Sequence, residues 1–420
     1  MKINGQRMLN NLYELRKFTD TPGKGVTRFS FTETDAKARE YIIKRAEAAG
    51  CNVTVDALQN IRIGLPGNVP GRKTVIAGSH IDSVKCGGWL DGVAGVTGAL
   101  EVMETLAAAA EGGSVEGKPL KYNYEVMIFA EEEGSNFGST MTGSKFLTGI
   151  YGEEELDKLH DDTGRTLRDA LEAVNNAPVD LSNILIDFDS IKTMLELHIE
   201  QGPVLDREGL QLGVVDCIFG MRVVEVTLTG VGNHAGACPM AERYDALMAA
   251  SEAMLAAEVL VKSDPDKRTV VTMGKLDILP NQSNVIPETV KFSLEVRDND
   301  QGKIDCYMDR CIEKIREVAS ARGVECEIKE HSKAAPIKLS SRVVDDMVRR
   351  AEAAGMSYKV MNSGAVHDAC MLAYHVDTGM IFVPSINGRS HVPEENTEEC
   401  DIIAGAQFLM DTVLTELTTE

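Results

Sequence analysis

The stretch Gly78-Ser79-His80-Ile81-Asp82-Ser83-Val84, followed closely by Gly87-Gly88-Trp89-Leu90-Asp91-Gly92, decides the fold. The apolar run Thr74-Val75-Ile76-Ala77 precedes it and predicts a buried strand. The histidine and the first carboxylate would therefore lie at the carboxyl end of a strand, where open α/β sheets place their sites. Asp91 precedes a long apolar-periodic stretch that predicts a helix. A histidine and carboxylates on adjoining rigid elements indicate a metal site.

Further fragments along the chain also place histidines or acids where a predicted strand ends. They are Val126 to Ala130 before Glu131-Glu132-Glu133, Leu195 to Leu197 before His198, the flexible Ser363-Gly364-Ala365-Val366 before His367-Asp368, and Ile381 to Pro384 before Gly388-Arg389-Ser390-His391. Taken singly, each could be a solvated acidic patch or a histidine bonded to backbone. Three adjacent acids repel one another unless a cation neutralises them. Taken together, five ligands with one shared carboxylate suit two metal ions.

Composition limits the classes of partner. The 420 residues predict two domains, and the formal net charge is −22 with a pI of about 4.9. This acidity argues against nucleic acid and anionic membranes, but one local arginine can still hold a small anionic substrate. The nine cysteines form no C-x-x-C pair and predict reduced thiols. Residues 1–7 lack an apolar core and no run approaches a membrane span, so we expect a soluble, cytoplasmic protein.

The secondary-structure pattern predicts an interrupted α/β fold. Residues 1–212 alternate helix-like and strand-like segments, and 330–420 return to this rhythm. Between them, 213–329 read as strand, helix, strand, strand, helix, strand, the order of a ferredoxin-like α+β domain. Its first strand, Val223 to Thr229, alternates cleanly and is expected to be an edge that pairs across a two-fold axis. A homodimer is therefore expected, since symmetric dimers are the commonest oligomers.

Eight ordered motifs within residues 78–391 resemble the carbamoylase and allantoate amidohydrolase branch of the di-zinc aminoacylase/carboxypeptidase metallopeptidase clan. They are GSHIDSV, GGWLDG, AEEEGS, ELHIEQGPVL, NHAGACPM, NVIP, SGAVHDA and IFVPSINGRSH. ELHIEQG and SGA-x-HDA separate this branch from the peptidases of the clan. The resemblance implies a zinc-peptidase-like α/β sandwich as the catalytic domain, with the inserted domain acting as a lid and in dimerisation.

The resemblance also assigns the metal site. Asp91 would bridge two divalent ions, which could be zinc, manganese, cobalt or nickel, because all of these accept mixed nitrogen and oxygen ligands. Glu132 would be the general base, and Asp82 would orient His80. The implied metal ligands are His80, Asp91, Glu133, His198 and His391.

By the same resemblance, five residues would contact the substrate: Gln201, His234, Asn281, Arg297 and His367. His234 would act in the active site of the partner subunit, and Arg297 would hold the substrate carboxylate as a bidentate fork. Without the resemblance, His234 reads as a turn histidine, Arg297 as half of a surface ion pair and Asn281 as a turn former.

The expected reaction is hydrolysis of a linear C–N amide bond, from an N-carbamoyl-L-amino acid to the amino acid, carbon dioxide and ammonia. Allantoate and the substrate of β-ureidopropionase are alternatives, and a non-catalytic, metal-poor binding protein of the same fold is an alternative of another class. Two departures from the branch put the substrate in doubt: Asn136 replaces an arginine, and Ala237-Cys238 replaces two threonines.

Overall fold

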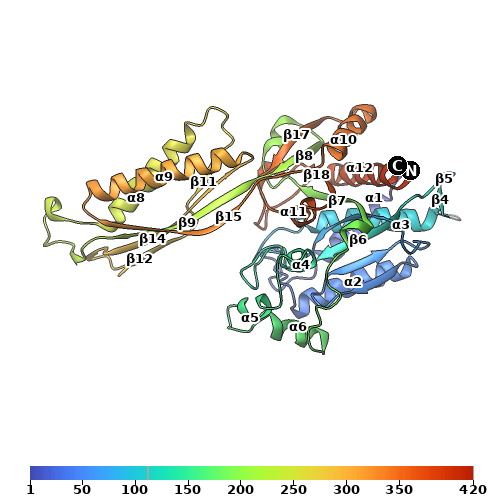
Figure 1. Cartoon of the computed structure of the whole chain (residues 1–420), viewed down its shortest axis with the longest axis horizontal. Coiled ribbons are helices and arrows are strands. Elements are labelled where there is room, and N and C mark those ends of the chain that lie inside the picture. Colours follow the sequence, from blue (N-terminus) through green and yellow to red (C-terminus); the bar gives the residue numbers. More distant parts are fainter. Residues whose placement is uncertain (111–112, 420) are drawn as a thin grey trace. The chain divides into compact units, whose positions relative to one another are not determined.

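The computed structural model describes residues 1–110 and 113–419. The chain forms two compact units (Figure 1). Unit 1 comprises Met1–Asp216, Lys338–Met361 and Ala365–Glu420, and unit 2 comprises Cys217–Ile337 and Asn362–Gly364. The predicted insertion, 213–329, ends inside strand β15 (Glu325–Ala334). The pairing of β15 with β9 (Gly220–Thr229) continues to Ala334, and unit 2 extends accordingly.

Unit 1 is built on a nine-stranded sheet in the order β1-β2-β6-β3-β7-β18-β8-β16, with β17 paired to β8. Its central strands β6, β3, β7 and β18 are parallel to one another, so their carboxyl ends share one edge. The strands are β1 (Asn52–Val55), β2 (Ile61–Gly64), β3 (Thr74–His80), β6 (Asn123–Phe129), β7 (Ile191–Ile199), β8 (Leu212–Ile218), β16 (Ile337–Lys338), β17 (Tyr358–Ser363) and β18 (Asp377–Val383). A separate two-stranded sheet joins β4 (Ser114–Val115) to β5 (Lys118–Pro119).

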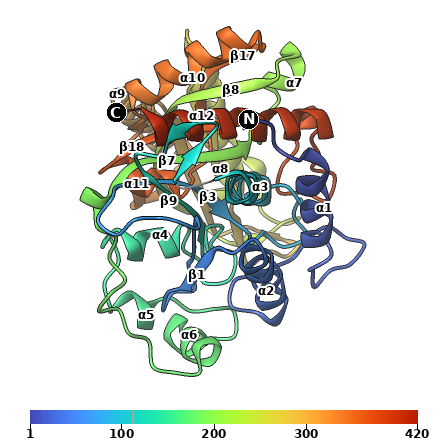
Figure 2. The same ribbon diagram turned by 90° about the vertical axis from the view of Figure 1, so that its right-hand side faces the viewer.

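Helices cover the sheet of unit 1. Every residue of β3 is buried, and α3 packs against β3, β7 and α12 (Figure 2). The helices are α1 (Gly5–Leu15), α2 (Glu33–Ala48), α3 (Val93–Ala109), α4 (Thr142–Leu147), α5 (Glu155–Lys158), α6 (Leu167–Asn175), α7 (Val204–Glu208), α10 (Ser341–Ala354), α11 (Ala369–Ala373) and α12 (Glu399–Thr418). Short 3₁₀ turns cover Phe188–Ser190 and Ile386–Gly388. A parallel sheet buried on both faces explains the nearly continuous apolar runs before the predicted ligands.

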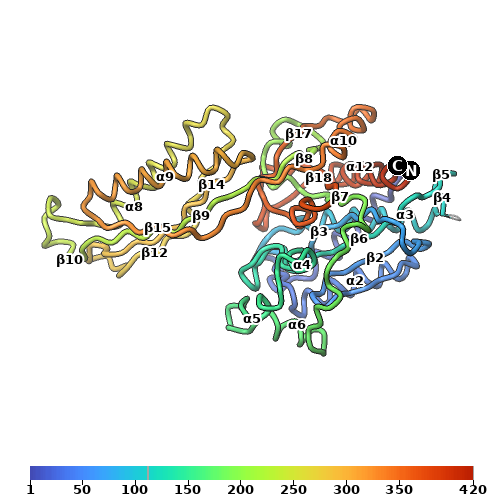
Figure 3. Tube along the Cα trace, in the orientation of Figure 1, coloured from blue at the N-terminus to red at the C-terminus, as the bar shows by residue number. Residues whose placement is uncertain are grey.

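Unit 2 is an α+β domain. Its sheet has the order β11-β14-β9-β15, with β12 also paired to β14, and α8 and α9 lie along one face (Figures 1 and 3). This is the predicted ferredoxin-like order, in which the first strand lies between the third and the last. The elements not yet bounded are α8 (Ala246–Lys262), α9 (Gln301–Ala321), β10 (Asn233–His234), β11 (Val270–Thr272), β12 (Leu276–Leu279), β13 (Val285–Ile286), β14 (Thr289–Asp298) and the 3₁₀ turn Met240–Glu242.

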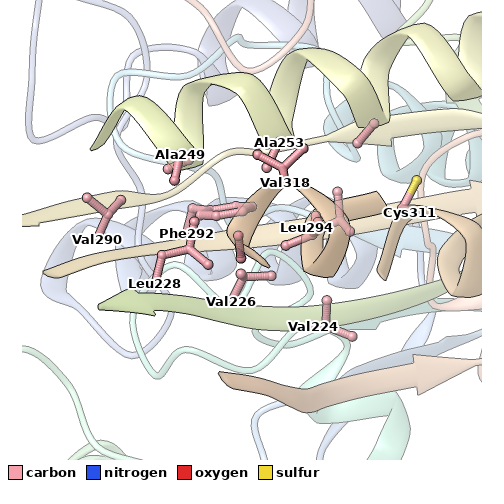
Figure 4. Close-up of a cluster of buried hydrophobic side chains, with 14 of the residues drawn as sticks. Val224, Val226, Leu228, Ala249, Ala253, Val290, Phe292, Leu294, Cys311 and Val318 are labelled. Carbon is pink, nitrogen blue, oxygen red and sulfur yellow. The ribbon is translucent and has the colours of Figure 1, made fainter. Parts of the chain in front are cut away.

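The alternation of β9 buries one of its faces. Val224, Val226 and Leu228 pack with Phe292 of β14 and with small side chains of α8 such as Ala253 (Figure 4). The alternation of apolar and polar residues in β9 therefore indicates a sheet with one face covered by helices.

The expectation that β9 is an edge strand is wrong. β9 pairs with β14 on one side and β15 on the other. A period-two pattern reports which face of a strand is buried and carries no information on its lateral neighbours. Among the described residues, none of the helices combines the length and apolarity needed to span a membrane.

Candidate metal centre

The centre lies at the edge of the unit 1 sheet where four parallel strands end. His80 is the last residue of β3, and His198 is the penultimate residue of β7. The acids Glu131 to Glu133 follow β6, and His391 follows β18. Because these strands are neighbours and run the same way, residues distant in sequence meet at one place.

Asp91 lies between two groups of side chains and gives one oxygen to each. Its Oδ1 is 3.5 Å from Nε2 of His80 and 3.1 Å from Nε2 of His198. Its Oδ2 is 3.2 Å from Nε2 of His391, which in turn is 3.5 Å from Oε2 of Glu133. In each group the potential ligand atoms all lie within 4.8 Å of one another. One carboxylate is thus shared by two sets of ligand atoms.

The backbone brings Asp91 into this position. Asp91 precedes α3, whose N-cap is Gly92. Gly92 has φ of 64°, and a Cβ there would lie 2.5 Å from Nε2 of His80. A side chain at residue 92 would therefore collide with the histidine, and the left-handed backbone also favours glycine.

Backbone carbonyl groups orient two of the histidines. Nδ1 of His80 is 3.1 Å from the carbonyl oxygen of Asp82, and Nδ1 of His198 is 2.9 Å from that of Ile199. In a neutral imidazole, an Nδ1 proton bonded to a carbonyl leaves Nε2 as the acceptor. Nε2 of His198 accepts from the N–H of Gly92 at 3.1 Å, which agrees with this tautomer. Nε2 of each ring therefore faces Asp91, and Nε2 of His198 also accepts from a backbone N–H.

Asp82 contacts His80 more weakly than it contacts the acidic loop. Its Oδ1 is 3.6 Å from Nδ1 of His80. The same carboxylate accepts hydrogen bonds from the backbone N–H groups of Glu132 and Glu133, at 3.2 and 3.0 Å. Asp82 therefore joins the loop after β3 to the loop after β6, a contact that its position after a histidine did not indicate.

The carboxylates are crowded. Burial raises the pKa of Glu132 well above its usual range, and the charges of Asp368 and Glu133 add to this effect. Burial and the charge of Asp91 raise the pKa of Glu133 to about 7. Burial alone would raise the pKa of Asp91, but the neighbouring histidines outweigh it and hold the pKa well below its usual range. Such crowding of acids favours a bound cation.

Unpaired oxygens show that divalent ions fit this site. Oε1 of Glu132, Oε1 of Glu133 and Oε1 of Gln201 are buried, and each lacks a hydrogen-bond partner among the described residues. Buried polar atoms are normally paired, so each unpaired oxygen indicates a missing partner. Imidazole nitrogens and carboxylate oxygens are ligands that zinc and similar ions accept.

Two of the expected substrate-contacting residues lie in unit 1. Gln201 has a left-handed backbone, with φ of 59°, and its Nε2 donates to Oδ2 of Asp91 at 2.7 Å. His367 is only 2% exposed, and its ring packs edge-on against His198 with centroids 4.5 Å apart. Gln201 therefore donates directly to Asp91, whereas His367 packs against His198, a candidate metal ligand.

The other three lie in unit 2. His234 is exposed and lines a pocket of about 580 Å³ together with Asn284 and Glu288. Asn281 is exposed in the turn between β12 and β13. Arg297 donates through Nε to Glu295 at 2.7 Å and through Nη1 to a carbonyl oxygen. The structure thus shows the ion pair of Arg297 that the sequence left open as an alternative.

The two departures from the branch have local structural partners. Asn136 donates through Nδ2 to the carbonyl oxygen of Ser30 at 2.8 Å, while its backbone N–H donates to Glu131 at 3.0 Å. Cys238 donates weakly to the carbonyl oxygen of Pro239, with 3.8 Å between sulfur and oxygen. Asn136 therefore helps to hold the loop that carries the acids.

Sequence reasoning gave no role to several buried acids near the centre. Glu196 accepts from Ser79 and from the backbone N–H of Ala369, and Asp368 accepts from Ser144. Glu196 could have been found from the sequence, because it interrupts the apolar run Leu195 to Ile199. Charged residues are seldom buried without a partner. Glu395 is also buried, and nothing in its local sequence marks it.

Metal-dependent hydrolases are the class that this fold and site define, because the two groups of imidazole and carboxylate ligands that share Asp91 could hold the metal ions that assist hydrolysis. The model of peptidase family M20/M25/M40 matches residues 76–415. The chain therefore belongs to peptidase family M20/M25/M40.

Similar proteins agree with this assignment. An N-carbamoyl-L-amino-acid amidohydrolase from Paenarthrobacter aurescens is 36% identical over 97% of each chain. An allantoate amidohydrolase from Escherichia coli is 33% identical over 94% of each chain. A solved amidase of the hydantoinase/carbamoylase family from Burkholderia multivorans has a TM-score of 0.87 at 32% identity, covering 100% of this chain and 99% of its own. The predicted α/β fold and the prediction of a hydrolytic enzyme are confirmed.

Proposed function

We propose that this enzyme hydrolyses the ureido C–N bond of an N-carbamoyl-L-amino acid and that it uses two divalent metal ions. The observation that carries the proposal is the sharing of Asp91, whose Oδ1 and Oδ2 face different histidines. Relatives named for N-carbamoyl-L-amino acids and allantoate support hydrolysis of a ureido compound, and the first of these is the more similar to this chain.

Five residues would hold the ions, with Asp91 common to both: His80 and His198 on one side, Glu133 and His391 on the other. Zinc, manganese, cobalt and nickel all suit this mixture of nitrogen and oxygen ligands. Bound there, the ions would polarise the ureido carbonyl and favour deprotonation of the attacking water.

Glu132 would be the general base. Its Oε2 lies 3.7 Å from Nε2 of His80, and its Oε1 is buried without a partner among the described residues. That oxygen is available to accept a proton from water and to deliver it to the leaving nitrogen. The carbamate released with the amino acid would break down to carbon dioxide and ammonia.

We assign the substrate contacts from the side-chain atoms that remain able to donate or accept a hydrogen bond. Gln201 donates its Nε2 to Asp91, which leaves Oε1 to accept an N–H of the ureido group. Nδ1 of His234 accepts from the N–H groups of Gly236 and Ala237, at 3.0 and 3.2 Å. The proton of the neutral ring is then on Nε2, where it can stabilise an oxyanion. Asn281 would donate to the same oxyanion, and Arg297 would bind the substrate carboxylate.

A homodimer is part of the proposal, but its contact surface differs from the expected strand. α8 exposes three large apolar side chains on one side: Met248 at 49%, Leu255 at 64% and Val259 at 67%. They line a groove of about 780 Å³ with charges of both signs, including Glu252 and Arg322. Such a surface suits a second copy, because a two-fold axis can pack each apolar stripe against its equivalent while acidic side chains of one copy meet basic side chains of the other.

We infer the cellular compartment from the redox state of the cysteines. All nine cysteines lie among the described residues, none of them forms a disulfide there, and four of them are buried. Reduced cysteines are typical of the cytosol, so we place the enzyme in the cytoplasm.

The decisive test is a substrate panel with detection of released ammonia. Enzyme loaded with zinc, manganese, cobalt or nickel would be offered N-carbamoyl-L-amino acids, N-carbamoyl-β-alanine and allantoate. The proposal expects the highest kcat/KM on an N-carbamoyl-L-amino acid. A preference for allantoate or N-carbamoyl-β-alanine would show that the proposed substrate is wrong and that the proposed hydrolysis of a ureido C–N bond is right. If none of these compounds releases ammonia with folded, metal-loaded enzyme, the proposal is wrong.

A further inference from the structure

We propose that Glu395 is the positioning residue that fixes Asp91 and His391 relative to each other. The inference rests on the proposed function, because it concerns the site of the ion held by Glu133 and His391. It assigns a task to a residue that lies outside the predicted ligands and that makes no contact with the reacting atoms.

The carboxylate of Glu395 joins the two segments that carry these ligands. Oε1 accepts from the backbone N–H groups of Leu90 and Asp91, at 2.9 and 3.0 Å. Oε2 accepts from Oγ of Ser390 at 2.8 Å and from the N–H of His391 at 3.3 Å. A single side chain therefore accepts from the backbone of both ligands and holds together two loops that are far apart in sequence.

The surroundings of Glu395 hold its carboxylate in place. Glu395 is 1% exposed, and its carbonyl oxygen accepts from Nε1 of Trp89 at 3.1 Å. A Cβ at Gly88 would lie 1.9 Å from the carboxyl carbon of Glu395, so only glycine leaves room for it. Ser390 completes the connection, because its Oγ is also 3.1 Å from Oδ2 of Asp91. The carboxylate thus occupies a space that the sequence Gly-Gly-Trp-Leu-Asp provides.

His391 needs such a restraint. Its φ is 60°, a left-handed conformation that is uncommon for residues other than glycine, and its side chain is 47% exposed. His80 and His198, by contrast, belong to buried strands. The placement of His391 therefore depends more on hydrogen bonds from outside its own element than the placement of the other two histidines does.

Oε1 of Glu395 accepts from the Asp91 segment and Oε2 from the His391 segment, so a change at one oxygen should affect one ligand more than the other. In Glu395→Gln, one oxygen can still accept from Leu90 and Asp91 while the new NH₂ faces the N–H of His391. The opposite orientation would set the NH₂ against two N–H donors and is less favourable. The substitution should therefore release His391 and leave Asp91 in place.

The experiment measures zinc affinity and stoichiometry by competition with a chelator, and follows the visible spectrum of the cobalt-loaded enzyme. The matched control is Asp264→Asn in unit 2, because Asp264 is also buried and also accepts hydrogen bonds from two backbone N–H groups and from the hydroxyls of Thr269 and Tyr307. In Glu395→Gln, we expect one ion at wild-type affinity and the other weakened by about 10–100-fold, the usual effect of losing a partner that orients a ligand. The cobalt spectrum should change for one ion only.

A second variant leaves the chemistry of Glu395 intact. Gly88→Ala would push the carboxylate away from Leu90 and Asp91 and should also weaken zinc binding. Its control is Gly274→Ala, where nothing lies within 4 Å of the added Cβ. Circular dichroism checks that each variant is folded, and Glu395→Gln remains informative if Gly88→Ala fails to fold.

The outcomes separate the inference from the proposed function. Wild-type enzyme that binds two ions, with unchanged affinities in Glu395→Gln, would overturn the inference alone. An equal loss of affinity in Asp264→Asn would also overturn it, because lost stability would then account for the effect. Wild-type enzyme that binds no ions would overturn the proposed two-metal function and this inference with it.

Discussion

Nε2 of His391 lies 3.2 Å from Oδ2 of Asp91, although the two residues are far apart in the sequence. The contact forms because β18 and β3 both flank β7 in a parallel sheet, so the loops that follow them leave the same edge. It makes Asp91 common to two ligand groups. The prediction that two ions bind rests on this shared carboxylate.

Metal analysis after dialysis should find two ions per chain in loaded wild-type enzyme. His80→Ala should lose at least one ion, because it removes a nitrogen from the group around Oδ1 of Asp91. The control is His160→Ala, because His160 is exposed and lies outside the centre. This variant should still bind two ions. Two ions bound at full affinity by His80→Ala would contradict the ligand assignment.

Glu132→Gln should keep both ions and the fold but lose turnover by about 10²–10⁴-fold, the usual contribution of a general base. Glutamine has nearly the same shape and cannot accept the proton. Glu133→Gln should instead lose affinity for one ion. Normal turnover in Glu132→Gln, together with a purely chemical defect in Glu133→Gln, would reverse the two roles.

Arg297→Lys should lower kcat/KM by about 10–100-fold on an N-carbamoyl amino acid and have much less effect on the corresponding amide. Lysine keeps the charge but loses the bidentate fork, and hydrogen bonds to charged groups contribute about 1.5–3 kcal/mol. Arg222→Lys, at an arginine that pairs with Glu330, is the control. An equal loss on both substrates would assign Arg297 to the structural ion pair with Glu295 instead.

Leu255→Glu should convert the proposed homodimer to a monomer in size-exclusion chromatography with light scattering. A charge at the centre of the apolar stripe of α8 would be buried unpaired in the interface. Leu185 is equally exposed, at 66%, but belongs to unit 1, so Leu185→Glu should remain dimeric. A dimer that survives Leu255→Glu must use another surface.

Asp264→Asn should destabilise unit 2 at neutral pH by about 1.5–3 kcal/mol, because Asp264 accepts charge-assisted hydrogen bonds while buried. Burial alone would raise the pKa of Asp264, but the N–H groups of Thr269 and Arg268, with Lys303, outweigh it and lower the pKa below its usual range.

This stabilisation is fully present above the unfolded carboxyl pKa of about 4 and is lost as the pH falls toward the lower folded pKa. Urea unfolding of the wild-type and variant enzymes should therefore converge in acid. The exposed Asp277 provides the control Asp277→Asn. A difference in unfolding free energy that stays constant from pH 7 down to pH 3 would contradict this account.

Much of this enzyme was predictable from local patterns. Apolar runs that end in histidines and acids gave β3, β7 and the ligand candidates, since the hydrophobic pattern of a strand is a local property of the sequence. Helical periodicity before Gly323 gave α9 with the bounds Gln301–Ala321. The alternation in β9 correctly gave one buried face, yet it could not show that β9 lies between β14 and β15. Lateral order in a sheet depends on contacts between segments, which no single segment encodes.

The sequence by itself predicted the types of candidate ligand, an α/β and an α+β domain, and the placement of most candidate ligands at or after the end of a strand. Only the tertiary structure decided which oxygen of Asp91 faces which histidine, that Asp82 holds the backbone of the acidic loop, and that Glu395 joins two ligand loops. The last two contacts are hydrogen bonds to backbone groups. Every residue except proline offers the same backbone N–H, so the identity of a residue does not mark it as the partner. Such partners are chosen by where the packed sheet places the loops.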